Sequence, residues 1–126
     1  MSTLWAFPGQ GAQQPGMLHA LPEAPVVQAC IEQASAALNE DVRRLDSAEA
    51  LQNTRAVQLC LLIAGVAAAR LLSERGHRPD YVAGLSIGAY AASVVAGSLE
   101  FADAVRLVAL RLSLIHISEP TRLRRI

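Results

Sequence analysis

The feature that most constrains this chain is the pattern G-x-S-x-G at residues 84–88. Residues 81–83 before it have the composition of a short strand, and residues 87–96 after it form a predicted helix of small residues closed by Gly97. Between a strand and a helix, this pattern is typical of a nucleophile elbow, a tight turn that presents a serine hydroxyl at a helix N-terminus. We therefore predict Ser86 as a catalytic nucleophile. The alternative is a glycine-rich turn whose serine has no chemical role.

A second turn, Pro8-Gly9-Gln10-Gly11, ends a short apolar run that we predict to be a strand. An elbow needs a further backbone N–H to stabilise an oxyanion, and this turn is the obvious source; the alternative is a simple tight turn. Apolar spacing and capping residues predict three more helices: 26–38, 56–72 between Asn53-Thr54 and Gly76, and 101–110. Strands alternating with helices predict an α/β fold with a parallel sheet.

Composition limits the classes of function. The chain of 126 residues is long enough for one domain, and its formal net charge is +0 without a basic stripe, which argues against nucleic acid as a partner. The N-terminus lacks a basic segment followed by a long apolar one, so we expect a cytoplasmic protein. Residues 59–72 are apolar but too short for a membrane span, and we expect a buried helix there. Cys30 and Cys60 have no disulfide or metal-ligand spacing and are predicted to be buried thiols.

Five stretches of the sequence, in this order and spacing, resemble malonyl-CoA:acyl-carrier-protein transacylases over nearly all of residues 4–111. They are FPGQGAQ at residues 7–13, Gly16-Met17, Asn53-Thr54 with Gln58, GLSIG at residues 84–88, and FADAVRLVALR at residues 101–111. The resemblance implies part of an α/β-hydrolase-like three-layer domain. It also implies that Ser86 takes malonyl from malonyl-CoA and passes it to the phosphopantetheine-type thiol of an acyl carrier protein, with no bound cofactor or metal.

By motif position, the resemblance implies roles for three further residues. The backbone N–H groups of Gln10 and Ile87 would form the oxyanion hole. Arg111 would pair with the free carboxylate of malonyl, because a planar guanidinium can bind a carboxylate through two hydrogen bonds and so favour a diacid over acetyl. Judged without the resemblance, Arg111 is a solvated cation at a helix end.

Two residues depart from the pattern usual in fatty-acid-synthesis members, which carry His before the serine and Glu after the second glycine. This chain has Leu85 and Ala89. With Gly16-Met17-Leu18-His19, they resemble more closely the transacylase (epsilon) subunit of bacterial malonate decarboxylase, so we expect that role and the other decarboxylase subunits as partners. The alternatives are a fatty-acid or polyketide malonyl transacylase, a serine esterase or lipase, and an inactive fragment.

A serine transacylase needs a general base, normally a histidine far downstream, and none of the three histidines fits that position. His19 and His77 are predicted to be solvated surface residues. His116 lies in a segment, beginning at Leu112, that resembles translated sequencing-adapter DNA. We therefore expect residues 1–111 to be the N-terminal part of the acyltransferase catalytic domain and residues 112–126 to be a non-native tail. Without the base, the truncated chain itself is expected to be inactive.

Overall fold

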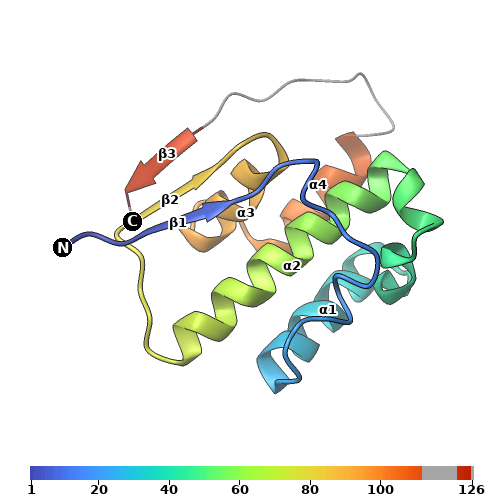
Figure 1. Ribbon diagram of the computed structural model, residues 1–126, viewed down its shortest axis with the longest axis horizontal. Helices are drawn as coiled ribbons and strands as arrows, with labels where there is room; N and C mark the ends of the chain where they lie inside the picture. Colours follow the sequence, from blue (N-terminus) through green and yellow to red (C-terminus); the bar gives the residue numbers. More distant parts are fainter. Residues whose placement is uncertain (112–121, 126) are drawn as a thin grey trace.

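The computed structural model describes residues 1–111 and 122–125 (Figure 1). His116 and most of the predicted tail lie outside the described residues. The elements in chain order are β1 Leu4–Phe7, α1 Pro25–Leu38, the 3-10 helices η1 Val42–Asp46 and η2 Ala50–Gln52, α2 Thr54–Glu74, β2 Tyr81–Gly84, α3 Ile87–Val95, α4 Phe101–Arg111 and β3 Arg122–Arg125. Every strand and α-helix predicted for residues 1–111 is present within a few residues of its expected bounds.

The strands form one sheet in the order β1-β2-β3. β1 and β2 are parallel, with Phe7 opposite Gly84, so the predicted parallel pairing is confirmed. β3 runs antiparallel to β2, which makes the sheet of the described residues mixed. Because β1 and β2 end at the same edge, the turn after Phe7 and the turn after Gly84 leave the sheet side by side.

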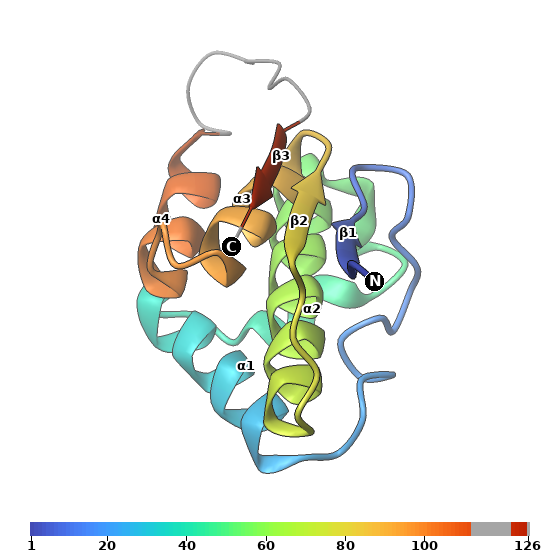
Figure 2. The ribbon, with the colours of Figure 1, turned by 90° about the vertical axis from the view of Figure 1, so that its left-hand side faces the viewer.

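The helices cover one face of this sheet. Figure 2 shows the three strands in front, with α2 and α3 behind them. Side-chain burial alternates accordingly, since Phe7 and Val82 are buried against the helices, whereas Leu4 and Ala6 on the other face are exposed. The described residues thus contain two of the three expected layers, a sheet and the helices on one of its faces.

Helix α2 is the centre of the hydrophobic core and packs against α1, α3 and α4. Its start is capped as expected, because the Asn53 side chain accepts a hydrogen bond of 2.8 Å from the Arg55 N–H. Gly76 just beyond its end has φ +92°, the left-handed geometry that ends many helices. The helix is long and apolar enough to cross a membrane by length and composition alone, yet 67% of that segment is buried inside the protein. The predicted buried helix is confirmed.

Both cysteines are free and fully buried. Burial raises the pKa of the Cys30 thiol to about 11, with a smaller opposing effect from Arg70. Burial, and then the nearby charge of Asp46, raises the pKa of the Cys60 thiol to about 12. Thiols with so high a pKa are poor nucleophiles, so the prediction of buried structural thiols is confirmed.

Candidate active site

The backbone of Ser86 has the geometry of a strained turn. Its φ of 55° and ψ of −116° lie in a region that residues with a side chain rarely adopt, and Ser86 stands between the last residue of β2 and the first of α3. Such a conformation costs of order 1–3 kcal/mol and persists only where the surrounding structure imposes it. The sharp reversal from strand to helix is the geometry expected of a nucleophile elbow.

The flanking glycines make this turn possible, because main-chain atoms occupy the space of their missing side chains. A Cβ on Gly84 would lie 2.0 Å from the carbonyl oxygen of Gly88, and a Cβ on Gly88 would lie 2.2 Å from the carbonyl oxygen of Phe7. Neither distance is possible for a real Cβ. Strand β1, strand β2 and the start of α3 therefore meet backbone to backbone around Ser86.

The turn after β1 touches the elbow directly. A Cβ on Gly9 would lie 2.8 Å from the carbonyl oxygen of Leu85, the residue before the serine. The Ala12 N–H donates to the Gly9 carbonyl at 3.4 Å and closes the turn, while the Gly11 N–H donates to Oε1 of Gln13 at 2.7 Å. In the described part of the chain, no hydrogen bond engages the N–H of Gln10.

The N–H of Ile87 is available for a different reason. Ile87 is the first residue of α3, and the first N–H groups of an α-helix have no acceptor within the helix. The following N–H groups of Gly88 and Ala89 donate to the carbonyls of Leu85 and Ser86. The half-buried Ser86 side chain does not cap α3. The structure thus brings together three of the four predicted site residues: Ser86, Ile87 and, through the contact of its neighbour Gly9, Gln10.

The fourth predicted residue, Arg111, is the last residue of α4. Its backbone is described, but its side chain lies outside the description, so its role in binding malonyl stays a prediction. Neither of the two described histidines lies where a general base for Ser86 is needed. His77 is an exposed residue after α2, and His19 contacts Asp46.

The prediction that His19 is a solvated surface residue is confirmed, and the structure adds a contact that was not predicted. Its side chain is 61% exposed, but its Nδ1 atom lies 2.7 Å from Oδ2 of the buried Asp46. The same carboxylate oxygen accepts hydrogen bonds from the backbone N–H groups of Leu18 and His19, and the Asp46 carbonyl accepts one from Gly16. Asp46 therefore fastens residues 16–19 to η1, a contact across 27 residues of sequence that no local pattern could reveal.

Gln58 is a further residue beside the site to which sequence reasoning assigned no role. It lies in α2, is 2% exposed, and donates a long hydrogen bond of 3.5 Å from Nε2 to Oε1 of Gln10. Its own Oε1 is buried without a hydrogen-bond partner in the described structure. Its place in the motif Asn53-Thr54…Gln58 was visible in the sequence, but its burial and its contact with Gln10 were not.

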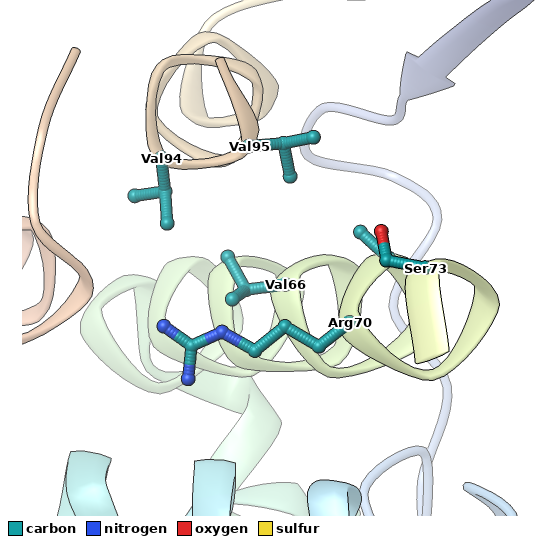
Figure 3. A pocket seen from close by; sticks show the side chains of 6 residues that line it. Val66, Arg70, Ser73, Val94 and Val95 are labelled. Carbon is teal, nitrogen blue, oxygen red and sulfur yellow. The ribbon is translucent and has the colours of Figure 1, made fainter. Parts of the chain in front are cut away.

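A small cavity of about 160 Å³ lies between α2 and α3, away from the elbow. Figure 3 shows Val66 and Arg70 of α2 facing Val94 and Val95 of α3 across it. Val94 and Val95 end α3, whereas Ser86 precedes its first residue, so this cavity is not at the predicted acyl site. Arg70 is engaged in packing, since its guanidinium lies over the Phe101 ring and donates to Gln33. Within the described residues, no group of three or more His, Cys, Asp or Glu side chains could hold a metal ion.

Comparisons with known proteins agree on one family. The family model of the acyl transferase domain matches residues 4–122 of this chain. The malonyl CoA-acyl carrier protein transacylase of Escherichia coli K12 is 44% identical over an alignment of 112 residues, and the match covers 85% of this chain and 36% of that protein. An acyl-carrier-protein S-malonyltransferase from Burkholderia pseudomallei has a TM-score of 0.83 and 38% identity over 90% of this chain and 38% of its own.

A third relative was solved as a complex. It is a malonyl-transacylase bound to a type II polyketide synthase acyl-carrier protein, with a TM-score of 0.81 and 40% identity over 88% of this chain and 38% of its own. This chain therefore spans well under half the length of the relatives it matches.

Proposed function

This chain belongs to the family of acyl transferase domains, and on that premise we propose that it is part of an enzyme that transfers malonyl from malonyl-CoA to the thiol of an acyl carrier protein. The observation that carries the proposal is the backbone of Ser86, with φ 55° between β2 and α3. A strained conformation at a serine, next to the available N–H of Ile87 and to the turn that carries Gln10, fits a nucleophile and has no purpose in a turn without chemistry. Membership of this family also decides against a serine esterase or lipase.

The reaction consists of two matched acyl transfers. Ser86 Oγ attacks the thioester carbonyl of malonyl-CoA, and the electron pair of the C=O bond moves to the oxygen. The N–H groups of Gln10 and Ile87 donate to that oxyanion, helped by the positive end of the α3 dipole. The carbonyl re-forms, the C–S bond breaks, and CoA leaves as the thiol, which leaves malonyl as an ester on Ser86. The carrier thiol then attacks this ester in the same way and regenerates the serine.

The proton of Ser86 must pass to a general base and from it to the leaving thiolate. The described residues place no histidine against Ser86, so we assign the base to the part of the enzyme beyond this chain. Arg111, at the end of α4, is proposed to hold the malonyl carboxylate.

The carrier partner is best described at the level of acyl carrier proteins. The relatives carry acyl-carrier-protein names, and one was solved with a polyketide carrier, which supports the fatty-acid or polyketide alternative over malonate decarboxylase. The malonate decarboxylase role and its partner subunits rest on Leu85, Ala89 and the segment Gly16-Met17-Leu18-His19, and they stay predictions. The cytoplasmic location also stays a prediction.

The proposal is tested with a chimeric enzyme in which residues 1–111 of this chain replace the matching part of the Escherichia coli relative. We expect the chimera to move malonyl from malonyl-CoA to a phosphopantetheine-bearing carrier protein, with malonyl found on the Ser86 peptide by mass spectrometry. The Ser86→Ala variant should lose both the acyl-enzyme and at least about 10³-fold in rate. A folded chimera that transfers nothing, or that keeps its rate in Ser86→Ala, would overturn the proposal.

The role of Arg111 has a separate readout in the same chimera. Arg111→Ala should lower kcat/KM for malonyl-CoA by roughly 10²-fold or more, because a bound carboxylate loses its charged partner, while acetyl-CoA should gain relative to malonyl-CoA. An equal loss for both substrates would show that Arg111 supports the fold and does not select the acyl group.

A further inference from the structure

Gln58 stands at a place where a glutamine opposes folding. Among the described residues it is one of two buried polar side chains, and the other, Asp46, is satisfied by several donors. Gln58 instead leaves Oε1 buried without a partner. A buried acceptor without a hydrogen bond destabilises the folded state, and each such case calls for an explanation. Leu61 and Leu62, one turn further along α2, are apolar and buried, so an apolar side chain of the same length would suit the core better.

The one contact that Gln58 makes leads to the turn beside the elbow. Its Nε2 donates to Oε1 of Gln10, 48 residues away in sequence. The other hydrogen bonds described for residues 9–13, from Ala12 to Gly9 and from Gly11 to Gln13, stay within the turn. The bond from Gln58 is therefore the one described hydrogen bond that ties this turn to the rest of the protein.

We propose that Gln58 is a positioning residue, which holds the turn at residues 9–12 through the Gln10 side chain so that the Gln10 N–H stays directed at the acyl oxygen on Ser86. This inference rests on the proposed acyl transfer for its purpose, though the contact itself is a property of the fold. The buried helix α2 supplies a rigid support, and the polar amide supplies the hydrogen bond that an apolar residue could not. The stability cost of Gln58 is explained by the preorganisation of an oxyanion donor.

The contact is tested by hydrogen exchange on the full 126-residue chain, read by mass spectrometry on peptides that cover residues 8–14. The variants are Gln58→Met, Gln10→Met and the double variant, because methionine has nearly the same length and lacks the amide. Gln28→Met, on an exposed glutamine that binds Arg43, is the matched control. We expect exchange at Gly11 and Ala12 to rise roughly 2- to 10-fold in each single variant, the range for one neutral hydrogen bond. The double variant should show no further rise.

A purely structural role for Gln58 gives a different pattern. In our proposal Gln58→Met leaves the exchange of α2 peptides unchanged and keeps or raises Tm, because it removes the orphaned acceptor. A loss of protection throughout α2, an unchanged turn, additive effects in the double variant, or a turn that already exchanges freely in the parent chain would each overturn the proposal.

Kinetics of the chimeric enzyme supply a second readout. Gln58→Met should lower kcat roughly 3- to 10-fold with KM for malonyl-CoA unchanged, since the oxyanion forms only in the transition state. An unchanged kcat would show that the held turn does not serve catalysis and would overturn the inference. If the parent chimera is inactive while the exchange pattern is as expected, the proposed function fails and the contact between Gln58 and the turn stands.

Discussion

Single residues around the elbow divide into those that the sequence could predict and those that it could not. Ser86 was predictable because the pattern at residues 84–88 is contiguous, and because a strand before it and a helix after it leave one geometry for the turn. The need for a second donor pointed to the turn at residues 8–11, whereas Gln10 and Ile87 were named as donors by the family resemblance, and these roles stay predictions. Gln58 and Asp46 were beyond prediction, since their roles come from contacts with residues 48 and 27 positions away.

Replacing Gly88 by alanine should disrupt the elbow. The new Cβ would meet the Phe7 carbonyl oxygen at 2.2 Å, and neither backbone can retreat without opening the sheet. We expect a loss of more than about 3 kcal/mol in the free energy of unfolding, measured by urea denaturation. Gly65→Ala is the control, because its Cβ meets the Phe7 ring at 3.1 Å and alanine favours the helix; it should stay within about 1 kcal/mol of the parent. Equal effects of the two changes would contradict this account.

The buried thiols make the protein sensitive to alkali. In the folded state the pKa of Cys60 is about 12 against an ordinary 9.0, so above pH 9 the unfolded chain loses a proton that the folded chain keeps. The stability linked to Cys60 is therefore complete below about pH 9 and falls as pH rises towards the folded value, by up to about 1.4 kcal/mol per pH unit. Cys60→Ala should show a shallower decline between about pH 8 and pH 11 in urea titrations. Cys30, whose pKa is raised to about 11, should have an effect in the same direction. Parallel curves of unfolding free energy against pH for the parent and the variants would refute the linkage.

Secondary structure elements were predicted well where the signal is local. Apolar spacing in the sequence predicts helices α1 to α4, and short apolar runs that end in glycine turns predict strands β1 and β2. The two short helices η1 and η2 were missed, because a 3-10 turn of three to five residues has no apolar period to detect. The position of η1 depends instead on Asp46, which accepts hydrogen bonds from backbone N–H groups in the loop at residues 16–19.

Asp46→Asn should therefore loosen one loop and one short helix together. The amide keeps the shape of the carboxylate but loses its charge, and it weakens the bonds from Leu18 and His19. We expect a loss of about 1.5–3 kcal/mol in unfolding free energy and faster hydrogen exchange at residues 16–19, with α4 unaffected. Asp41→Asn is the matched control, since its exposed carboxylate caps η1 through the N–H of Arg43; it should cost less than Asp46→Asn. Stability unchanged in Asp46→Asn would refute the role of this carboxylate.

At the scale of the whole molecule, the matched part of this chain covers 36% to 38% of the length of the relatives reported above. Within the described residues, helices cover one face of the sheet, and Leu4 and Ala6 are exposed on the other. Neither a third layer nor a general base beside Ser86 is found among the described residues, and both stay predictions. The sequence predicted the layered α/β class. The general base could not be predicted from it, because none of the three histidines fits that position.

Removing residues 112–126 should test the predicted boundary after Arg111. If this segment is foreign to the domain, the shortened chain should keep its unfolding free energy within about 1 kcal/mol of the parent, as judged by urea denaturation. The family match extends past Arg111 to residue 122, and β3 pairs with β2, so a loss of several kcal/mol would show that the segment belongs to the fold. Sequencing the source DNA across the Arg111 codon would settle its origin independently.

The backbone contacts at Gly9, Gly84 and Gly88 have a genetic consequence. The atoms that would obstruct a side chain at these positions are carbonyl oxygens and other main-chain atoms, which every amino acid possesses. No second mutation at Leu85, Gly88 or Phe7 can remove them, so a lesion at any of the three glycines has no local suppressor. Gly65 differs, because its obstacles are the side chains of Phe7 and Ala91, which a compensating codon change can shrink. A suppressor screen would thus recover revertants of Gly65 lesions by second-site change, and those of the three elbow glycines by restoration of glycine itself.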